Sequence, residues 1–528
     1  MNRKTSLEKL EKTEKWDVII IGGGATGLGV AADAASRGYK TLLLEQSDFA
    51  KGTSSRSTKL VHGGVRYLAQ GNVRLVREAL RERGYILKNA PHLSRKQAFL
   101  IPVYSFLERL KYSAGMKLYD LMAGSQQIGH AAWLNKAKVI ESIPGIKGDG
   151  LKGGVLYYDG QFDDARMAVS LAATCTDWGG TVLNYIRVIK LSKNDQGKLN
   201  GVIAKDEADG REYQLKAKII INATGVFVDE IHQMDDGSKE RTVKPSQGIH
   251  LVLPREFLET TVNALMIPKT DDGRVLFMVP WHDHLLAGTT DTPLEEHTLE
   301  PRALEKEIAF ILNTAERYLK KKTSRQDVLS VFAGLRPLAI PAGDGNQKKA
   351  SKDISRNHVL QVSKSGLITI TGGKWTTYRK MAEDTVDKAI EVGGFSFKPC
   401  ITKHLKIHGY FQSENKKEWN VYGSDWGKIQ QMINEDPVMG EILDEAWPFT
   451  CAEVAWAVRE EMAVNVEDVL SRRFRVLFLD AKAATRMAPK VAEIMKKELG
   501  KNEQWKEAQI KAFEELASGY LLSTGIPA

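Results

Sequence analysis

Residues 17–62, DVIIIGGGATGLGVAADAASRGYKTLLLEQSDFAKGTSSRSTKLVH, decide the fold. The apolar residues 18–21 predict a buried strand, and the pattern Gly22-x-Gly24-x-x-Gly27 follows directly and opens an alanine-rich helix. Glycines at these three positions allow a tight turn, a close approach of the backbone to a pyrophosphate, and close packing of helix against strand. The N-terminus of the helix then presents its positive end to the pyrophosphate.

A second predicted strand, residues 41–44, ends in Glu45, about 20 residues beyond the glycines. A carboxylate at this position accepts hydrogen bonds from both hydroxyls of an adenosine ribose, and it disfavours a 2′-phosphate. Glycine triplets also occur in ordinary loops. The strand, the glycines, the helix and the acid in this order nevertheless predict a bound dinucleotide.

The choice between NAD and FAD depends on the segments that follow. Residues 53–59, TSSRSTK, carry hydroxyls and cations that can contact the rest of an extended FAD, and the strands expected at 218–222 and 367–371 each run into a glycine-bearing turn. The helix expected over residues 376–390 points its positive end towards a flavin pyrimidine ring, where charge accumulates on reduction. We therefore expect non-covalently bound FAD. The expected cofactor contacts are Gly22, Gly24, Thr26, Gly27, Glu45, Thr53, Ser54, Ser55, Thr58, Lys59, Ala223, Thr224, Gly225, Gly372, Gly373, Lys374, Trp375 and Thr376.

Longer motifs extend from near residue 17 to near residue 390: IIGGGATGLGVAADAASRG, TSSRSTKLVHGGVRYL, EALRERGYILKNAPHL, INATG, QGIHLVLP, GTTDTP, GLRPL and TGGKWTTYRKMAED. On these motifs the chain resembles the FAD-dependent glycerol-3-phosphate dehydrogenases. These are respiratory flavoenzymes of the wider D-amino-acid-oxidase-like superfamily that pass electrons to quinone. The segments HGGVRYL and GGKWTTYR are far more specific than the nucleotide fingerprint. Trp375 departs from the smaller apolar residue expected at its position and so alters the expected pocket.

We expect an α/β fold, more fully an α+β composite, in which a Rossmann-like FAD-binding domain is interleaved with an antiparallel-sheet substrate domain. Helical periods from about residue 400 predict a helical C-terminal cap domain. The strand-like runs of the substrate domain are 155–158, 249–253, 275–279 and 285–287, and the helical runs of the cap include 451–461 and 466–473. Residues 347–355 read as a polar loop. The expected divisions are a charged N-terminal tail (1–16), the composite unit (17–395) and the helical domain (396–528).

Composition agrees with a large enzyme, because 528 residues exceed one ordinary domain and 42% hydrophobic content supplies sizeable cores. Three scattered cysteines suit neither a disulfide framework nor a zinc cluster, and no EF-hand loop is present, so we expect no metal. The first 15 residues lack the apolar core of a signal peptide, and no run of 18 apolar residues could span a bilayer. We expect a reducing environment, at the cytoplasmic face of a membrane or in the cytoplasm.

The net charge of +9 points to an anionic partner. Nucleic acid is disfavoured, because the chain has no zinc-finger spacing, RNP pattern or dense basic arm. Residues 104–123 place an apolar stripe at helical spacing beside cations that can reach anionic headgroups. The alternative is a helix that buries this stripe in the core, but the resemblance implies a peripheral membrane enzyme and favours an anchor. The stripe is Leu107, Leu110, Ala114, Leu118 and Leu121, and the cations are Arg109, Lys111 and Lys117.

Alcohol oxidation by a flavin requires one base and, for a phosphorylated substrate, several cations. The hydroxyl loses a proton while a hydride leaves the same carbon, and the phosphate must be held so that the reacting atoms meet. In HGGVRYL, the resemblance makes Arg66 and Tyr67 substrate contacts and His62 the first candidate base. A structural histidine and a surface ion pair are the simpler interpretations of His62 and Arg66.

Further site residues come from the same resemblance. Arg336 in GLRPL resembles the arginine over the flavin, and Lys374 resembles the lysine after the double glycine; both can stabilise an alkoxide or a reduced flavin. Arg356 is matched more loosely as a phosphate contact, and His250 is the second candidate base. Thr290 is expected to shape the pocket, whereas its neighbour Asp291 reads equally well as a turn residue.

These features predict oxidation of sn-glycerol 3-phosphate to dihydroxyacetone phosphate, with FAD as first and a quinone as second acceptor. The closest alternative is an oxidase of the same family that uses oxygen and releases peroxide. More distant alternatives are oxidation of another 2-hydroxy acid or amine and a flavin-binding protein without turnover. The sequence leaves the oligomeric state open, a homodimer included.

Overall fold

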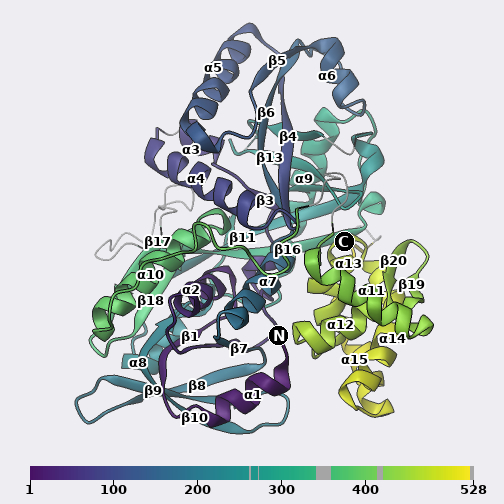
Figure 1. Ribbon diagram of the computed structural model, residues 1–528. Coiled ribbons are helices and arrows are strands. Elements are labelled where there is room, and N and C mark those ends of the chain that lie inside the picture. The colour runs from purple at the N-terminus through teal and green to yellow at the C-terminus, as the bar shows by residue number, and fades with distance from the viewer. Residues whose placement is uncertain (70, 261–262, 272, 341–357, 413–419, 524–528) are drawn as a thin grey trace.

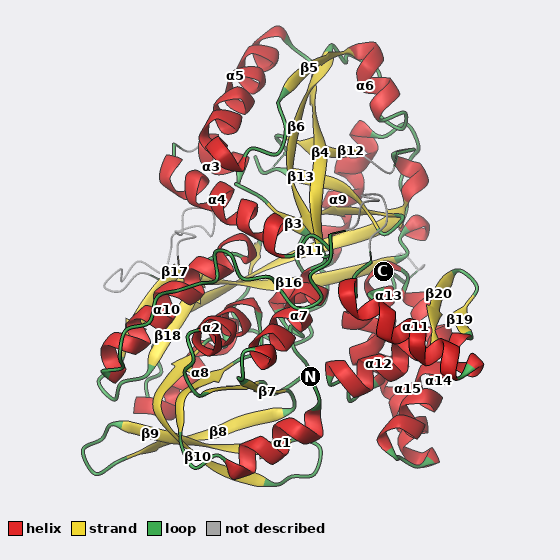
Figure 2. Ribbon diagram, viewed as in Figure 1, coloured by secondary structure: helices red, strands yellow, loops and turns green. Residues whose placement is uncertain are grey.

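The computed structural model describes residues 1–528 except residues 70, 261–262, 272, 341–357, 413–419 and 524–528. Two large β-sheets and a C-terminal group of helices with a two-stranded sheet build the chain (Figures 1 and 2). One sheet lies in the lower left of the view, the second rises towards the top, and the C-terminal helices lie at the lower right.

The first sheet has eight strands and a parallel centre, and β1 and β2 at this centre match the strands predicted at residues 18–21 and 41–44. The order along its main path is β17-β18-β10-β1-β2-β7, and β8 and β9 extend it through β10. Strand β1 pairs in parallel with both β10 and β2, so the glycine turn after β1 lies at the centre of the sheet edge. The strands are β1 (Trp16–Ile21), β2 (Thr41–Leu44), β7 (Thr181–Leu183), β8 (Ile186–Lys193), β9 (Leu199–Asp206), β10 (Glu212–Asn222), β17 (His358–Val362) and β18 (Ile368–Gly372).

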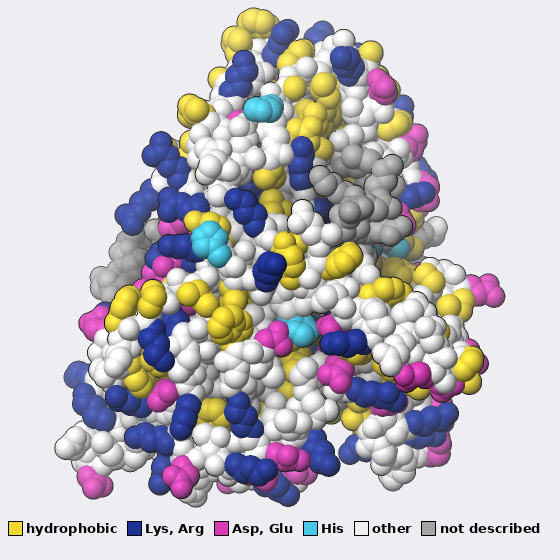
Figure 3. All heavy atoms as spheres, viewed as in Figure 1, with side chains coloured by type: hydrophobic (Ala, Val, Ile, Leu, Met, Phe, Trp, Pro, Cys, Tyr) yellow, Lys and Arg dark blue, Asp and Glu magenta, His cyan; other side chains and the backbone are white. Residues whose placement is uncertain are grey.

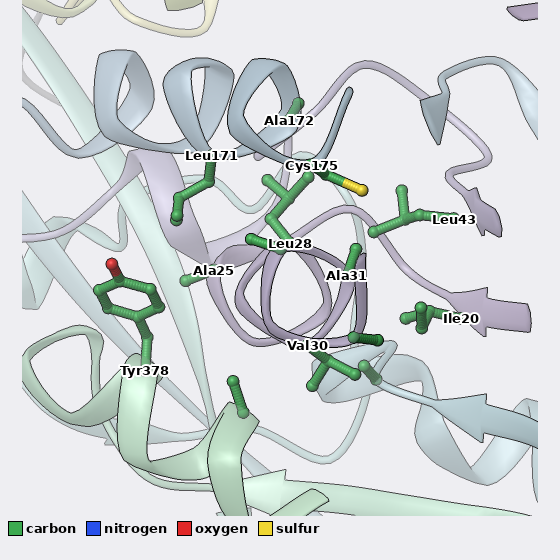
Figure 4. Close-up of a cluster of buried hydrophobic side chains, with 14 of the residues drawn as sticks. Ile20, Ala25, Leu28, Val30, Ala31, Leu43, Leu171, Ala172, Cys175 and Tyr378 are labelled. Atoms are coloured by element: carbon green, nitrogen blue, oxygen red, sulfur yellow. The ribbon is translucent and has the colours of Figure 1, made fainter. Parts of the chain in front are cut away.

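Helix α2 (Ala25–Ser36) forms the core of this sheet together with α7 (Asp164–Asp177) and α10 (Tyr378–Gly393). Figure 4 shows α2 end-on, with Leu28 and Ala31 between the strands and α7, and Tyr378 approaching from α10. All but one of the α2 residues are buried, and this explains its alanine-rich composition. Each fully buried aliphatic side chain stabilises the fold by about 1.5–3 kcal/mol relative to exposure.

The expected charged tail is instead a packed helix, α1 (Arg3–Lys12). Its Leu10 is buried in the second face of the first sheet, and Arg3 forms a 2.9 Å ion pair with Asp206. Trp16, also assigned to the tail, is the first residue of β1. The charged composition of residues 1–16 gave no indication of this helix, because only a few of its side chains face the sheet.

The second sheet has ten strands and is antiparallel except where β12 pairs with β4. The order is β15-β11-β14-β13-β12-β4-β6-β3, with β16 beside β11 and β5 beside β6. The sequence-based strand predictions at residues 155–158, 249–253 and 285–287 lie within β6, β11 and β14, and 275–279 overlaps β13. The strands are β3 (Leu60–Val61), β4 (Ser94–Val103), β5 (Ala132–Asn135), β6 (Gly153–Phe162), β11 (Val243–Pro254), β12 (Asn263–Ile267), β13 (Leu276–Trp281), β14 (His284–Gly288), β15 (Thr292–Pro293) and β16 (Ser330–Ala339).

Strands of the two sheets alternate along the chain, so the predicted interleaving is confirmed. The expected loop 347–355 lies outside the described residues. The helices not yet placed, apart from those of the C-terminal group, are α3 (Val65–Ala69), α4 (Val73–Asn89), α5 (Phe106–Ala123), α6 (Lys136–Ser142), α8 (Val228–Asp236) and α9 (Glu305–Tyr318).

The C-terminal helices have a core of their own. A capping box between Thr450 and Glu453 starts α12 at the predicted residue, and the predicted helical run 466–473 contains a π-helical segment, Asp468–Arg473. The boundary at residue 396 stays a prediction. The elements are α11 (Trp426–Glu435), β19 (Ile442–Asp444), β20 (Trp447–Thr450), α12 (Cys451–Glu461), α13 (Val476–Leu479), α14 (Ala481–Leu499) and α15 (Glu503–Ser518).

Buried ion pairs join these helices to the first sheet. Asp48, which follows β2, accepts hydrogen bonds from Arg472 and Arg473 of the π-helical segment. Both arginines and the carboxylate are excluded from solvent. Removing one partner would leave an uncompensated buried charge, which typically costs about 3–5 kcal/mol. The C-terminal helices are therefore fixed against the segment that follows the glycine turn.

Candidate active site

The turn between β1 and α2 leaves no room for a Cβ at Gly22 or Gly27. Gly22 has φ +109°, and a Cβ there would lie 2.7 Å from the carbonyl oxygen of Ala223. A Cβ on Gly27 would collide with the carbonyl oxygen of Gly22. Gly24 differs, because its Cβ would meet only Ser54 Oγ, at 3.2 Å, and the remaining space opens into a cavity.

This dinucleotide cavity has a volume of about 420 Å³ and lies along the ends of the central strands. Glu45 lines it, and its two carboxylate oxygens accept hydrogen bonds from the N–H groups of Gly23 (2.6 Å) and Ser47 (2.9 Å). Burial raises the pKa of Glu45, and these two backbone hydrogen bonds partly offset that effect. Each oxygen retains a lone pair for a ribose hydroxyl. The predicted contacts that line this cavity are Gly22, Gly24, Thr26, Glu45, Thr53, Ser54, Ala223, Thr224, Gly225, Gly372, Gly373, Lys374 and Trp375.

A second cavity, the substrate cavity, has a volume of about 300 Å³ and shares a wall with the first. Its lining includes Thr53, Arg56, Lys374 and Trp375, which also line the dinucleotide cavity. The two cavities therefore form one extended cleft, and this suits FAD, whose adenosine and flavin ends are far apart. The residues present fit that cofactor: the open space at Gly24 accommodates a pyrophosphate and Glu45 a ribose.

The double glycine after β18 brings the backbone to the junction of the two cavities. Gly372 and Gly373 have φ of +72° and +73°, which glycine adopts without strain. Lys374 Nζ lies 3.7 Å from the ring centroid of Tyr67, a residue of α3. Trp375 donates from Nε1 to the carbonyl oxygen of Ser54 at 2.7 Å, so the unexpected tryptophan joins this turn to the segment after β2.

Both candidate bases line the substrate cavity. The backbone N–H of His62 donates to Thr376 Oγ1 at 3.1 Å, which fixes the HGG segment (residues 62–64) to the turn before α10. His250, within β11, is stacked on Phe332 and hydrogen-bonded through Nε2 to Thr58 Oγ1 at 2.9 Å. Burial, reinforced by the positive charges of Lys59 and Arg336, holds the pKa of His250 well below its usual value. His250 is therefore neutral at physiological pH.

Several hydrogen bonds fix the guanidinium group of Arg336, a residue of β16. Its Nη2 donates to Thr289 Oγ1 and to the carbonyl oxygen of Thr290, both at 3.0 Å, and Nη1 donates to Asp291 Oδ1 at 3.4 Å. The hydroxyl of Thr290 donates to Glu307 Oε1 at 2.7 Å and accepts from Ile249 N–H. Thr290 thus lines the cavity, but its hydroxyl is already committed within the protein.

Two predicted cofactor contacts, Ser55 and Lys59, do not reach the cavities. Lys59 Nζ is fully buried and donates to Asp164 Oδ2 and to the carbonyl oxygen of Ser55, both at 2.7 Å. Burial, together with the nearby charge of Arg475, lowers the pKa of Lys59 to about 7, although Asp164 opposes this effect. We therefore assign these residues a contact with α7 in place of a cofactor contact. The other residues of the segment 53–59 line one or both cavities, and composition does not show which of its side chains turn to the core.

The structure places the other predicted site residues in different parts of the site or outside it. Tyr67, Thr58 and Thr376 line the substrate cavity. Arg66 lies on α3, next to Tyr67, and Arg356 lies outside the described residues. Gly27 acts in helix–strand packing rather than at the cavity. No group of three or more histidine, cysteine, aspartate or glutamate side chains in the described part of the chain is placed to hold a metal ion.

The sequence reasoning missed several cavity residues. Arg274, at the turn before β13, Phe277 on β13 and Asp159 on β6 all line the substrate cavity. Phe277 lies edge-on to His62, with ring centroids 6.2 Å apart. The sequence carries no clear signal for them, because a charged turn before an apolar strand is common in any antiparallel sheet.

The fold and the extended cleft define the class of the protein as a dinucleotide-binding flavoprotein. The family model described as FAD dependent oxidoreductase matches residues 17–379, and the one described as C-terminal domain of alpha-glycerophosphate oxidase matches residues 367–509. The chain belongs to the FAD-dependent glycerol-3-phosphate dehydrogenase family, and FAD is its cofactor.

The individual relatives match nearly the whole chain. It is 41% identical to the probable mitochondrial glycerol-3-phosphate dehydrogenase of Caenorhabditis elegans, over 98% of this chain and 75% of the relative. Identity to the mitochondrial glycerol-3-phosphate dehydrogenase of Homo sapiens is 38%, over 97% of this chain and 74% of the relative. The crystal structure of the glycerol-3-phosphate dehydrogenase of Bacillus halodurans in complex with FAD matches with a TM-score of 0.79 and 28% identity, over 100% of this chain and 99% of that one.

Proposed function

We propose that the protein oxidises sn-glycerol 3-phosphate to dihydroxyacetone phosphate at the substrate cavity and passes the electrons to a quinone. The observation that carries this proposal is the convergence of Arg336, Lys374 and two histidines on one cavity that opens into the dinucleotide cavity. A passive flavin-binding scaffold has no need for cations and a neutral imidazole at that junction. The printed names of the relatives support the same substrate.

The residues divide the chemistry between them. FAD, when bound, accepts the hydride that leaves C2 of the substrate. A histidine takes the proton of the C2 hydroxyl, and Arg336 and Lys374 stabilise the negative charge that develops on the oxygen. We keep His62 as the first candidate base and His250 as the second. The neutral state of His250 supports its candidacy, whereas its stacking on Phe332 also suits a structural role.

Arg66 is proposed as a phosphate contact through its place beside Tyr67 on α3. Two residues of α3, Val65 and Tyr67, line the substrate cavity, and the ring of Tyr67 contacts Lys374. Arg356 keeps the same proposed role from the resemblance alone.

We propose a membrane surface as the site of quinone reduction. In the described part of the chain no helix combines the length and the apolar character needed to cross a bilayer. Helix α5 turns its apolar stripe to the surface: the exposed fractions of Leu107 and Leu121 are 77% and 78%, and Phe106, Leu110 and Leu118 are exposed as well. Figure 3 shows hydrophobic side chains with Lys and Arg beside them at the tip of the molecule where α5 lies.

The structure contradicts the alternative in which the stripe is buried. The face of α5 that packs inward carries Met116, Tyr119 and Ala123 instead. Tyr119 accepts a hydrogen bond from Gly63 N–H at 2.8 Å and donates to Asp159 at 2.6 Å, so α5 also supports the HGG segment from behind. A surface that meets lipid thus adjoins the substrate cavity.

Anaerobic mixing of the flavin-loaded protein with glycerol 3-phosphate tests the proposed function. We expect the flavin absorbance to bleach quickly and to return on addition of a soluble quinone, with much slower return on addition of oxygen. Absence of bleaching would reject the substrate. Fast return with oxygen and release of peroxide would identify an oxidase, the activity that the matched C-terminal family description names.

A further inference from the structure

A carboxylate lies among the cations of the substrate cavity. Asp291, just before β15, lines this cavity, and only 6% of its side chain is exposed. Its Oδ1 lies 3.4 Å from Arg336 Nη1, and its Oδ2 lies 4.0 Å from Arg274 Nη1. Ser246 donates its hydroxyl hydrogen to Oδ1. Ser246 and Arg336 are direct cross-strand partners in β11 and β16, so the sheet fixes both groups around the carboxylate.

The negative charge of Asp291 repels a phosphate that binds in the same cavity. Tight ion pairs between guanidinium and carboxylate have donor–acceptor distances of about 2.7–2.9 Å. Both distances from Asp291 exceed that range, so neither guanidinium is locked to the carboxylate. Arg336 keeps its position through Thr289 and Thr290, whereas Arg274 lies on the turn before β13 and 26% of its side chain is exposed.

We propose that Asp291 takes the place of the substrate phosphate between Arg336 and Arg274, and that Arg274 is a phosphate contact that sets selectivity for a dianion. This inference rests on the proposed function. Coulomb attraction grows with the charge of the ligand, so a phosphate dianion gains about twice as much from each arginine as a carboxylate does. The fixed charge of Asp291 repels a dianion about twice as strongly as a monoanion, so the attraction of the two arginines must outweigh this repulsion. The two arginines thereby favour a phosphorylated substrate over a hydroxy acid of the same length.

Calorimetric titration of the flavin-loaded protein with inorganic phosphate tests the inference without turnover. Loss of a charge-assisted contact of about 1.5–3 kcal/mol corresponds to roughly a 10- to 150-fold weaker Kd. We expect this loss for Arg274→Met and a smaller loss for Arg274→Lys, which keeps the charge but not the planar fork. Asp291→Asn should bind phosphate several-fold more tightly and should widen the gap in affinity between phosphate and glycerate, a monoanion, because the lost repulsion is proportional to the charge of the ligand.

Matched controls come from an exposed ion pair on neighbouring elements, Arg255 with Asp283 at 3.0 Å. Arg255→Met and Asp283→Asn should leave the Kd for phosphate unchanged. In rapid-mixing experiments with glycerol 3-phosphate, Arg274→Met should raise the substrate concentration for half-maximal flavin reduction and leave the limiting rate within a few-fold.

Two results would overturn the inference. If Arg274→Met leaves phosphate binding unchanged, the arginine does not contact phosphate. If Asp291→Asn weakens phosphate binding as Arg274→Met does, the carboxylate only aligns the guanidiniums. If Asp291→Asn does not retain flavin, the Kd values of Arg274→Met and Arg274→Lys for phosphate decide whether the inference holds. A wild-type protein that binds phosphate but is not reduced by glycerol 3-phosphate would reject the proposed substrate while leaving the anion site intact.

Discussion

At the scale of single residues, the glycines of the turn after β1 and the two histidines of the substrate cavity give the most specific predictions. Gly22 and Gly27 are required by the backbone itself, since a Cβ at either would meet a carbonyl oxygen. Gly24 is required by the cofactor instead, because the protein leaves room at that position. Substitution of Gly24 therefore separates cofactor binding from folding better than substitution of its neighbours.

We expect Gly24→Val to yield a folded protein without FAD, because its branched side chain occupies the space in which backbone and pyrophosphate meet. The flavin-to-protein absorbance ratio after purification measures this. Gly427→Val is the control, because a Cβ at Gly427 meets nothing within 4 Å and lies far along the chain from the turn. Stoichiometric flavin in Gly24→Val would reject the assignment of the turn.

The general base is the second prediction at this scale. If His62 takes the hydroxyl proton, His62→Gln should slow flavin reduction by roughly 10²-fold or more while substrate still binds, because general-base catalysis typically contributes 10²–10⁴. Rapid-mixing absorbance of the flavin measures the rate, with His250→Gln in parallel. Reduction at the wild-type rate in His62→Gln, with loss in His250→Gln, would move the role to His250.

At the scale of elements, α5 has two faces with different tasks. The inner face supports the HGG segment through Tyr119, and the outer face exposes leucines beside Arg109, Lys111 and Lys117. Burial of the leucines in the headgroup boundary and attraction of each near-surface cation, about 1 kcal/mol per residue, would act together.

We expect Leu110→Glu with Leu118→Glu to release the protein from anionic vesicles while activity with a soluble dye acceptor is kept. Wild-type binding should weaken in high salt without being abolished. Sedimentation with vesicles measures both effects. The control is Phe397→Glu with Val438→Glu, which places the same charges at exposed apolar positions outside α5. Unchanged sedimentation of the α5 variant would assign the stripe to another partner.

At the scale of the whole molecule, ion pairs join parts that are distant in sequence. His408 donates through both ring nitrogens, to Asp177 Oδ2 at 2.7 Å at the end of α7 and to Asp425 Oδ2 at 2.8 Å before α11. These two carboxylates raise the pKa of His408 to about 9, against the opposing effect of burial. The protonated histidine therefore links the first sheet to the C-terminal region at neutral pH.

Because the folded pKa of His408 is raised above its unfolded value, its contribution to stability is fully present below about pH 6.5 and is lost as pH rises through about 9. We expect His408→Gln to lower the melting temperature at pH 6 and to match the wild type near pH 10. Thermal unfolding of the flavin-loaded protein across this range measures the difference. A deficit that does not change with pH would show that packing, not charge, is the contribution of His408.

The sequence by itself determined the central strands of the first sheet, the cofactor and the position of the glycine turn. These follow from local causes: glycine sterics at Gly22 and Gly27, an apolar run of strand length, and an acid at the end of the next strand. Helical periodicity likewise located α12 and α5, although the outward direction of the α5 stripe depended on what packs behind it.

Only the tertiary structure decided which side chains share the substrate cavity. Ser246 and Arg336 meet because β11 pairs with β16 in one register, and no local pattern encodes a pairing between residues so far apart in the sequence. The same non-local packing turned Lys59 towards Asp164 and away from the cofactor, and it placed Arg274 opposite Asp291. Steric constraints on the backbone depend on residues that are close in the sequence. The surroundings of a charged side chain depend on strands that meet only when the chain folds.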